Sequence, residues 1–274
     1  MAKKSVLSAL AMALTLAVSA PALSGCNSTT SNSVTTDRTQ IMLVSEQEVM
    51  AEADKYYQNV LAEAKRTKTL NTNKQTYNRV RKIADKMIKI APTFRADCKD
   101  WKWEVNVFTS DEVNAWCAAG GKIGVYTGII DTLKLTDDEL ATVLSHEIAH
   151  ALREHSREQM SAEYAKQTAM SVASFLGVET QKLQLADIVS QVGLSLPFSR
   201  SHETEADELG LELMYRAGYN IDAAPKLWEK MIALSGSSNG LTNLLSTHPS
   251  GEDRIENLTR VAAELKGSKT DAKK

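Results

Sequence analysis

The stretch His-Glu-Ile-Ala-His at residues 146–150 decides how this chain is to be interpreted. Residues four positions apart share one face of a helix, so the imidazoles of His146 and His150 can point at a single metal ion. Zinc takes such nitrogen ligands in tetrahedral geometry. Glu147 adjoins His146, where its carboxylate can reach a water at the metal. The pentapeptide therefore predicts a zinc site with a catalytic base beside it.

The residues around the pentapeptide predict a capped and buried helix over about 137–157. Thr136 and Glu139 have the spacing of a capping box, and acidic residues fill the first turn. The residues on both sides of the pentapeptide are mainly apolar, which indicates a helix embedded in the core. His155 follows His150 at an angle of about 140° around this helix, so we expect it to point away from the metal.

A catalytic zinc needs a third protein ligand and an open fourth position. The metzincin pattern is excluded, because Arg153 and Ser156 stand where it requires Gly and a third His. The best source of the third ligand is the segment 199–207, in which Glu203 and Asp207 lie four positions apart on a second expected helix. One carboxylate can bind zinc while the other accepts the free N–H of a zinc-bound histidine. Glu205 in this segment and Glu208 directly after it are expected to face solvent.

The rest of the chain is predicted to be mostly helical, with a small antiparallel sheet. The sheet is expected from the alternating stretch 101–108, and from short strands at 113–118 and 122–128 on either side of Gly120 and Gly121. Helices are expected at about 45–66, 73–90, 200–217, 222–235 and 250–265, with two or three more within 158–193. The fold class is therefore α+β, with helices dominant.

Residues 1–25 have the features of an export signal rather than of a folded segment. Two lysines at 3–4 precede a short apolar run over 6–18. The sequence Leu-Ser-Gly-Cys at 23–26 closely resembles a bacterial lipobox, in which the cysteine thiol is acylated and the chain is cut before it. We therefore expect Cys26 to carry a lipid anchor. The alternative is an ordinary secretory signal with a chance cysteine.

The segment 26–44 is expected to be a disordered tether between this anchor and the folded part. Its stretch 27–40 is polar and of low complexity, and cannot bury enough apolar area to offset its ordering entropy. Asn27, where an Asp would favour the inner membrane, resembles the sorting signal of Gram-negative lipoproteins. The expected location is therefore the periplasmic side of the outer membrane, with the protein held there by its lipid.

Two further cysteines, Cys98 and Cys117, are expected to form a disulfide in an exported protein. The bond would close a loop of about 20 residues and contribute roughly 3 kcal/mol on the loop-entropy model. The alternative is a pair of free, buried thiols.

Composition limits the classes of function. The chain has 274 residues, of which 43% are hydrophobic and 24% charged, which excludes wholesale disorder and a polytopic membrane protein. Its 32 basic and 34 acidic residues give a formal charge of −2. Because no basic surplus is present to neutralise phosphates, nucleic acid is not expected as a partner.

Several motifs in order resemble one family, the M48 zinc metallopeptidases, which are Ste24- and HtpX-like gluzincins with a zincin fold. The resemblance covers roughly residues 45–265. Its motifs are Asn-Ala-Trp at 114–116, Gly-Gly-Lys-Ile at 120–123, His-Glu-Ile-Ala-His at 146–150, Arg-Ser-His-Glu-Thr-Glu-Ala-Asp at 200–207 and Thr-His-Pro at 247–249. It implies a peptidase domain over 45–266, followed by a charged tail at 267–274.

The resemblance also implies roles for individual residues. In the family, the third zinc ligand is the Glu that falls on Glu203 here, and Asp207 would orient a ligand. The stretch Asn114, Ala115 and Trp116 resembles the family's edge strand, which would hold an extended substrate by main-chain hydrogen bonds. An ordinary core strand is the alternative, with Trp116 as plain packing.

His248 has three alternative interpretations. The resemblance places it near the active-site cleft, where its imidazole would donate a hydrogen bond to the oxyanion. It would otherwise occupy the fourth position at zinc and hold the enzyme inactive, as a latch. The remaining alternative is a surface histidine at the start of a helix.

By resemblance, the chain is expected to be a zinc endopeptidase of the periplasmic lipoprotein branch, similar to LoiP- and BepA-like peptidases without a tetratricopeptide domain. Its expected cofactor is one zinc ion. Its expected substrates are unfolded or misassembled cell-envelope proteins, and outer-membrane assembly machinery is a further implied partner. The alternative function is a non-catalytic periplasmic chaperone or assembly scaffold on a peptidase fold.

Overall fold

The computed structural model describes residues 26–31, 33, 38–175, 198–234, 244–248 and 252–271. The expected export signal and the part of the predicted helices that falls on 176–193 lie outside these residues. Two long helices open the folded part. Helix α2 (Glu46–Arg66) begins at a capping box between Ser45 and Glu48, and α3 (Lys74–Ile90) begins where the side chain of Asn73 accepts two backbone N–H groups. Both helices therefore begin where the sequence predicts.

The sheet has three strands, β3 (Glu104–Phe108), β4 (Ala115–Ala118) and β5 (Lys122–Tyr126), in the order β3-β5-β4. Gly120 and Gly121 both have positive φ, and they form the turn of an antiparallel β4–β5 hairpin. Strand β3 runs parallel to β5, so the prediction of a wholly antiparallel sheet is wrong. The reason is that the chain reverses twice after β3 and returns β5 into the position beside it.

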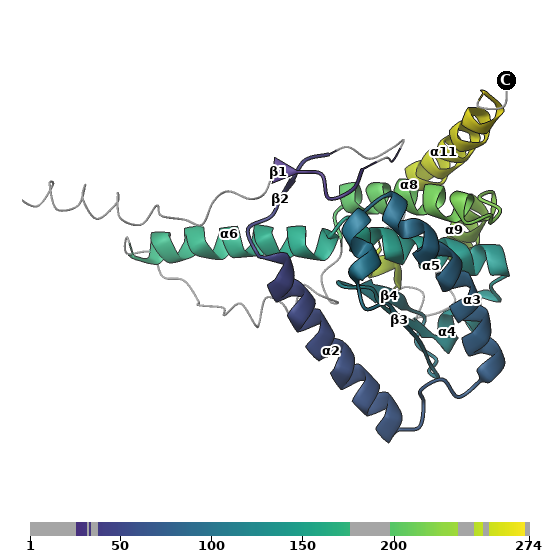
Figure 1. Ribbon diagram of the computed structural model, residues 1–274, viewed down its shortest axis with the longest axis horizontal. Coiled ribbons are helices and arrows are strands. Elements are labelled where there is room, and N and C mark those ends of the chain that lie inside the picture. The colour runs from purple at the N-terminus through teal and green to yellow at the C-terminus, as the bar shows by residue number, and fades with distance from the viewer. Residues whose placement is uncertain are drawn as a thin grey trace, which may run out of the picture.

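Helix α5 (Asp137–Leu152), which carries the pentapeptide, lies in the middle of the fold. It follows the short helix α4 (Thr127–Leu133) and begins at the predicted capping box of Thr136 and Glu139. Figure 1 shows α5 together with three later helices, which are α8 (Arg200–Arg216), α9 (Ala223–Leu234) and α11 (Glu252–Asp271). Helix α11 runs on into the segment expected to be a charged tail. One core of buried apolar side chains joins α3, α5, α8, α9 and the sheet.

Helix α5 ends earlier than predicted. It stops at Leu152, and a separate helix, α6 (His155–Phe175), begins three residues later. Glu154 between them has a φ of 51°, in the left-handed region, so the backbone changes direction there. The expectation of one continuous helix to about residue 157 is therefore wrong, and His155 does not lie where helical periodicity would place it.

The segment expected to be a disordered tether lies, in its described part, against the folded domain. Strands β1 (Cys26–Asn27) and β2 (Gln40–Ile41) pair antiparallel, and Figure 1 shows them beside α6. Gln40 is fully buried, and its side-chain amide donates to the carbonyl of Arg153 at 2.7 Å. The expectation of disorder is wrong for these residues, because hydrogen bonds to buried partners replace the missing apolar contacts.

Cys98 and Cys117 are both free, so the expected disulfide is wrong and the alternative of two thiols holds. Cys98 lies in the short helix η2 (Ala96–Asp100) before β3, which follows η1 (Ala91–Thr93), whereas Cys117 lies on β4 at the opposite edge of the sheet. The element that carries Cys98 leads into β3, and β4 pairs with β5 and not with β3. Burial raises the pKa of Cys98 to about 12, which makes this thiol unreactive. None of the described helices is long and apolar enough to cross a membrane.

Candidate metal centre

Helices α5 and α8 pack closely together, and this contact builds the site. Glu203, Asp207 and Gly210 lie on the face of α8 that is turned toward α5. A Cβ atom on Gly210 would stand 3.0 Å from backbone atoms of Ser145 and His146. The glycine therefore permits the close approach of the two helices, which brings the acids of α8 beside the histidines of α5.

Four side chains from three segments point their donor atoms at one another. The Nε2 atoms of His146 and His150 are 3.0 Å apart, and Glu203 Oε1 lies 3.3 Å from Nε2 of His150. His248 Nδ1 lies 3.1 Å from that same oxygen and 3.3 Å from His146 Nε2. One ligand atom of each residue lies within 4.8 Å of all the others, and all four residues are buried. Such a cluster could hold one metal ion.

The charges around these donors favour a cation among them. Burial opposes ionisation of Glu203, but His248 and His146 hold the pKa of its carboxyl well below the usual range. Burial also opposes protonation of His146, yet Glu203 and Asp207 raise its pKa to about 9. The site therefore attracts positive charge. Imidazole nitrogens with one carboxylate oxygen are a donor set that zinc accepts, so the residues fit the expected metal.

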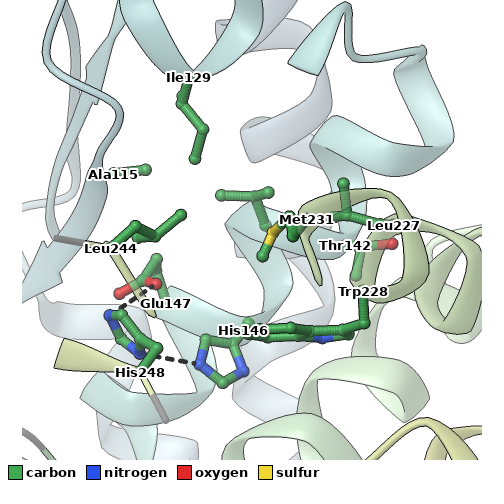
Figure 2. Close-up of a pocket in the computed structure, with 11 residues that line it drawn as sticks. Ala115, Ile129, Thr142, His146, Glu147, Leu227, Trp228, Met231, Leu244 and His248 are labelled. Carbon is green, nitrogen blue, oxygen red and sulfur yellow. Dashed lines mark hydrogen bonds and ion pairs between the residues drawn. The ribbon is translucent and has the colours of Figure 1, made fainter. Parts of the chain in front are cut away.

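Glu147 is buried beside the four donors and lines a pocket. Burial raises the pKa of Glu147, which brings this carboxylate closer to the range of a useful general base. Figure 2 shows the pocket with His146, Glu147 and His248 at one side and apolar side chains around the rest. The apolar lining consists of Ala115, Ile129, Val143, Leu227, Trp228, Met231 and Leu244.

Asp207 and Arg254 pair with members of the donor cluster. Asp207 Oδ1 lies 3.0 Å from Nδ1 of His146, which turns Nε2 of that imidazole toward the cluster. Arg254, in the first turns of α11, pairs with Glu203 Oε2 at 2.7 Å and with Asp207 Oδ1 at 2.8 Å. Its guanidinium lies 3.6 Å from the ring centre of Trp228. Sequence reasoning missed Arg254, because one arginine in a charged helix carries no signal of burial.

His155 and Glu205 also belong to the surroundings of the cluster, contrary to expectation. Nδ1 of His155 lies 2.9 Å from Nδ1 of His150, and its Nε2 lies 3.2 Å from Glu205 Oε2. The turn at Glu154 brings His155 back beneath His150 instead of pointing it away. Glu205 was expected to face solvent, but it is 8% exposed and pairs with the fully buried Arg153 at 2.7 Å.

The residues of the expected substrate strand, 114–116, have different surroundings. Strand β4 forms one edge of the three-stranded sheet and packs along α5, and Ala115 lines the pocket. The carbonyl of Asn114 accepts a hydrogen bond from the backbone N–H of Tyr126 in β5, at 3.1 Å. Trp116 is buried, and its ring packs against those of Tyr57 and Phe108 at centroid distances of 5.8 and 6.2 Å. Its side chain therefore has the packing role that was the alternative.

His248 is not a surface residue. It follows a short helical turn at 244–247, its side chain is buried, and its backbone N–H donates to the carbonyl of Leu244 at 2.9 Å. Its Nδ1 is one of the four donor atoms, and its Nε2 lies 3.7 Å from a carboxylate oxygen of Glu147. The surface interpretation is therefore wrong, because the imidazole is buried and contributes a donor atom to the cluster.

Comparisons with known proteins agree with this geometry. The metalloendopeptidase OMA1 of Schizosaccharomyces pombe is 41% identical over 58% of this chain, and the match spans 46% of OMA1. The metalloprotease YcaL of Escherichia coli is 26% identical over 69% of this chain and 74% of its own length. A putative beta-barrel assembly-enhancing protease of Vibrio cholerae is 28% identical over 52% of this chain and 31% of its own length. The chain thus spans less than half of the mitochondrial relative.

The model of peptidase family M48 matches residues 74–262, which include both histidines of the pentapeptide, Glu203 and His248. The four donor atoms and Glu147 thus lie within the part of the chain that the family defines. The metal-binding geometry and the match point to the same conclusion, and the chain belongs to peptidase family M48.

Proposed function

We propose that this protein is a zinc-dependent endopeptidase that cleaves unfolded or misassembled proteins of the cell envelope. The observation that carries the proposal is the buried cluster of His146, His150, Glu203 and His248, with the carboxylate of Glu147 beside it at the end of an apolar pocket. His146, His150 and Glu203 would hold the ion. A bound zinc ion would act as a Lewis acid and would make water nucleophilic at neutral pH.

Glu147 would act as the general base and then the general acid. Its raised pKa lets its carboxylate take a proton from the attacking water and return it to the leaving amine. Asp207 fixes the ring of His146 through Nδ1, and Arg254 fixes Glu203 and Asp207 together. These contacts preorganise the site, so that little reorganisation is needed during the reaction.

The pocket and the sheet edge support an unfolded polypeptide as the substrate. Main-chain groups on the edge strand β4 can pair with an extended peptide. A folded protein rarely exposes such a peptide, whereas an unfolded one does. The pocket beside Glu147 is lined by apolar side chains, and an unfolded chain exposes the apolar side chains that would fill it. Recognition would then depend on disorder and on one apolar side chain near the cleaved bond.

The location in the envelope is supported by sequence features. The lipobox-like stretch at 23–26 favours a lipid anchor at Cys26, and Asn27 favours the outer membrane. The Vibrio cholerae relative is named for beta-barrel assembly, which supports outer-membrane proteins as substrates or partners. The protein would then remove envelope polypeptides that fail to fold or assemble.

His248 would act as a latch in the resting enzyme. Its Nδ1 lies 3.3 Å from His146 Nε2 and 3.1 Å from Glu203 Oε1, so it would bind the metal in competition with substrate and water. Displacement of the segment at 244–248 would remove this competition. This arrangement favours the latch over an oxyanion donor, because the donor atom points into the ligand cluster.

The proposal is tested with unfolded casein, purified protein and a chelator. Wild type should cleave casein, the chelator should abolish cleavage and added zinc should restore it. Glu147→Gln should retain one zinc per chain and lose cleavage, because the base is removed without a ligand. If wild type never cleaves but suppresses aggregation equally well as Glu147→Gln, the chaperone or scaffold function is correct instead.

A further inference from the structure

The segment before α2 reaches the surroundings of the proposed metal centre. The match to the peptidase family begins at residue 74, so this segment lies outside the matched part. It is nevertheless fixed to the domain by hydrogen bonds. The Ser161 hydroxyl on α6 accepts the N–H of Leu43 at 2.9 Å, and the Arg157 guanidinium donates to the carbonyl of Val44 at 2.7 Å.

Arg38 in this segment joins two acids, the partly buried Glu158 and the buried Glu205. Its Nη1 and Nη2 atoms pair with the two carboxylate oxygens of Glu158 at 2.6 and 2.7 Å, and its Nε donates to Oε1 of Glu205. Gln40 donates to the same Glu158 at 2.7 Å. Glu158 on α6 and Glu205 on α8 are therefore held together by a residue from a third segment, and such bidentate pairs fix geometry well.

The other oxygen of Glu205, Oε2, is connected to the proposed metal ligand His150 through His155. Oε2 accepts from Arg153 Nη2 at 2.7 Å and from Arg153 Nε at 3.0 Å, and it lies 3.2 Å from His155 Nε2. A carboxylate only accepts hydrogen bonds, so the proton of His155 is on Nε2. The Nδ1 atom of a neutral His155 is then an acceptor.

This acceptor determines which ring nitrogen of His150 carries the proton. The two Nδ1 atoms of His155 and His150 are 2.9 Å apart, so His150 is the donor and carries its proton on Nδ1. Its Nε2 is then left with a free electron pair directed at His146 and Glu203. His146 has a carboxylate, Asp207, in this supporting position, whereas His150 depends on an intermediate histidine and a carboxylate beyond it.

We propose that Arg38 is a positioning residue for the metal centre: it holds Glu205 so that His155 keeps His150 in the tautomer that binds metal. The segment that leads from the expected lipid anchor is thereby part of the active-site support. The inference rests on the proposed zinc centre, since without a metal the tautomer of His150 has no consequence.

The test compares wild type with Arg38→Ala and Arg38→Lys in the full chain. The matched control is Arg66→Ala, which removes an exposed arginine whose partner Glu63 lies on the same helix. The zinc dissociation constant is measured by competition with a chromophoric chelator. The absorption spectrum of the cobalt-loaded protein reports the geometry of the ligands, and the melting temperature of the metal-free protein reports stability.

Arg38→Ala should weaken zinc binding about tenfold and change the cobalt spectrum, as losses behind a metal ligand do. Arg38→Lys should restore part of the affinity, since it keeps the charge but loses the bidentate pairing. Arg66→Ala should match wild type in both measurements. Because the Arg38 side chain is 38% exposed, its replacement should permit folding, and Arg38→Gln replaces Arg38→Ala if it does not.

The inference is overturned if Arg38→Ala keeps the wild-type zinc affinity and cobalt spectrum, even where the metal-free protein melts at a lower temperature. That result would leave the segment a purely structural attachment. If wild type itself fails to bind one zinc per chain, the proposed metal centre fails, and the inference falls with it. The two failures are therefore distinguished by the wild-type measurement alone.

Discussion

Replacement of Arg254 by Met should destabilise the metal-free protein strongly and the zinc-loaded protein much less. The Arg254 side chain is 8% exposed and pairs with Glu203 and Asp207, whose side chains are each 3% exposed. Removal of one partner from a buried ion pair costs about 3–5 kcal/mol, because the remaining charge is left without compensation. In a domain of this size each kcal/mol lowers the melting temperature by about 2–4 °C, so a fall of roughly 10 °C is expected.

Zinc should reverse much of this loss, since a divalent ion at the four-donor cluster supplies the positive charge that Arg254 provided. The assay is thermal unfolding of both proteins with chelator and with excess zinc. Arg260→Met is the matched control, because Arg260 lies on the same helix with a side chain 53% exposed and should change stability by at most about 0.5 kcal/mol. A fall within 2 °C in the metal-free variant, or an equal fall with zinc and with chelator, would refute the reasoning.

Three further predictions test the proposed ligands and the anchor. Glu203→Ala should lose stoichiometric zinc, measured by metal analysis after gel filtration, because only histidines would remain as donors; unchanged metal content would assign the third ligand elsewhere. His248→Ala should retain zinc and cleave casein faster than wild type, since the latch is removed; a rate lowered by about 100-fold with zinc retained would instead make His248 an oxyanion donor. Cys26→Ser should move the protein from the membrane pellet to the soluble fraction without changing its casein cleavage; continued pelleting would exclude the lipid as the anchor.

Local signals in the sequence predicted much of the fold and the centre of the site. The capping boxes at Ser45 and Thr136 are both confirmed, since a cap depends on residues only three positions apart. The Nε2 atoms of His146 and His150 lie 3.0 Å apart, as their spacing of four positions on one helix predicts without any contact distant in sequence. The family resemblance is confirmed as well. Interactions within one turn of a helix are thus readable directly from spacing.

The failures lie where the backbone departs from its regular period or where the partner is distant in sequence. The φ of 51° at Glu154 ends α5 and redirects the chain, and a non-glycine residue gives no warning of such a conformation. Arg254 is buried only because α11 crosses α8, and its partners Glu203 and Asp207 precede it by about 50 residues in the sequence. Charged side chains look alike in a sequence whether they face solvent or a buried partner.

The composition of the polar segment around Arg38 wrongly predicts disorder, because the partners of this segment are also distant in sequence. Composition measures how much apolar area a segment can bury, and this segment has little. Its attachment instead depends on hydrogen bonds to partners that the domain has already buried, such as the carbonyl of Arg153 with Gln40 and the carboxylate of Glu205 with Arg38. Without the segment, the carbonyl of Arg153 and the Oε1 atom of Glu205 would lose these bonds, and an unsatisfied buried polar group costs about 1–3 kcal/mol. The segment is therefore ordered by its hydrogen bonds to buried groups of the domain rather than by apolar residues of its own.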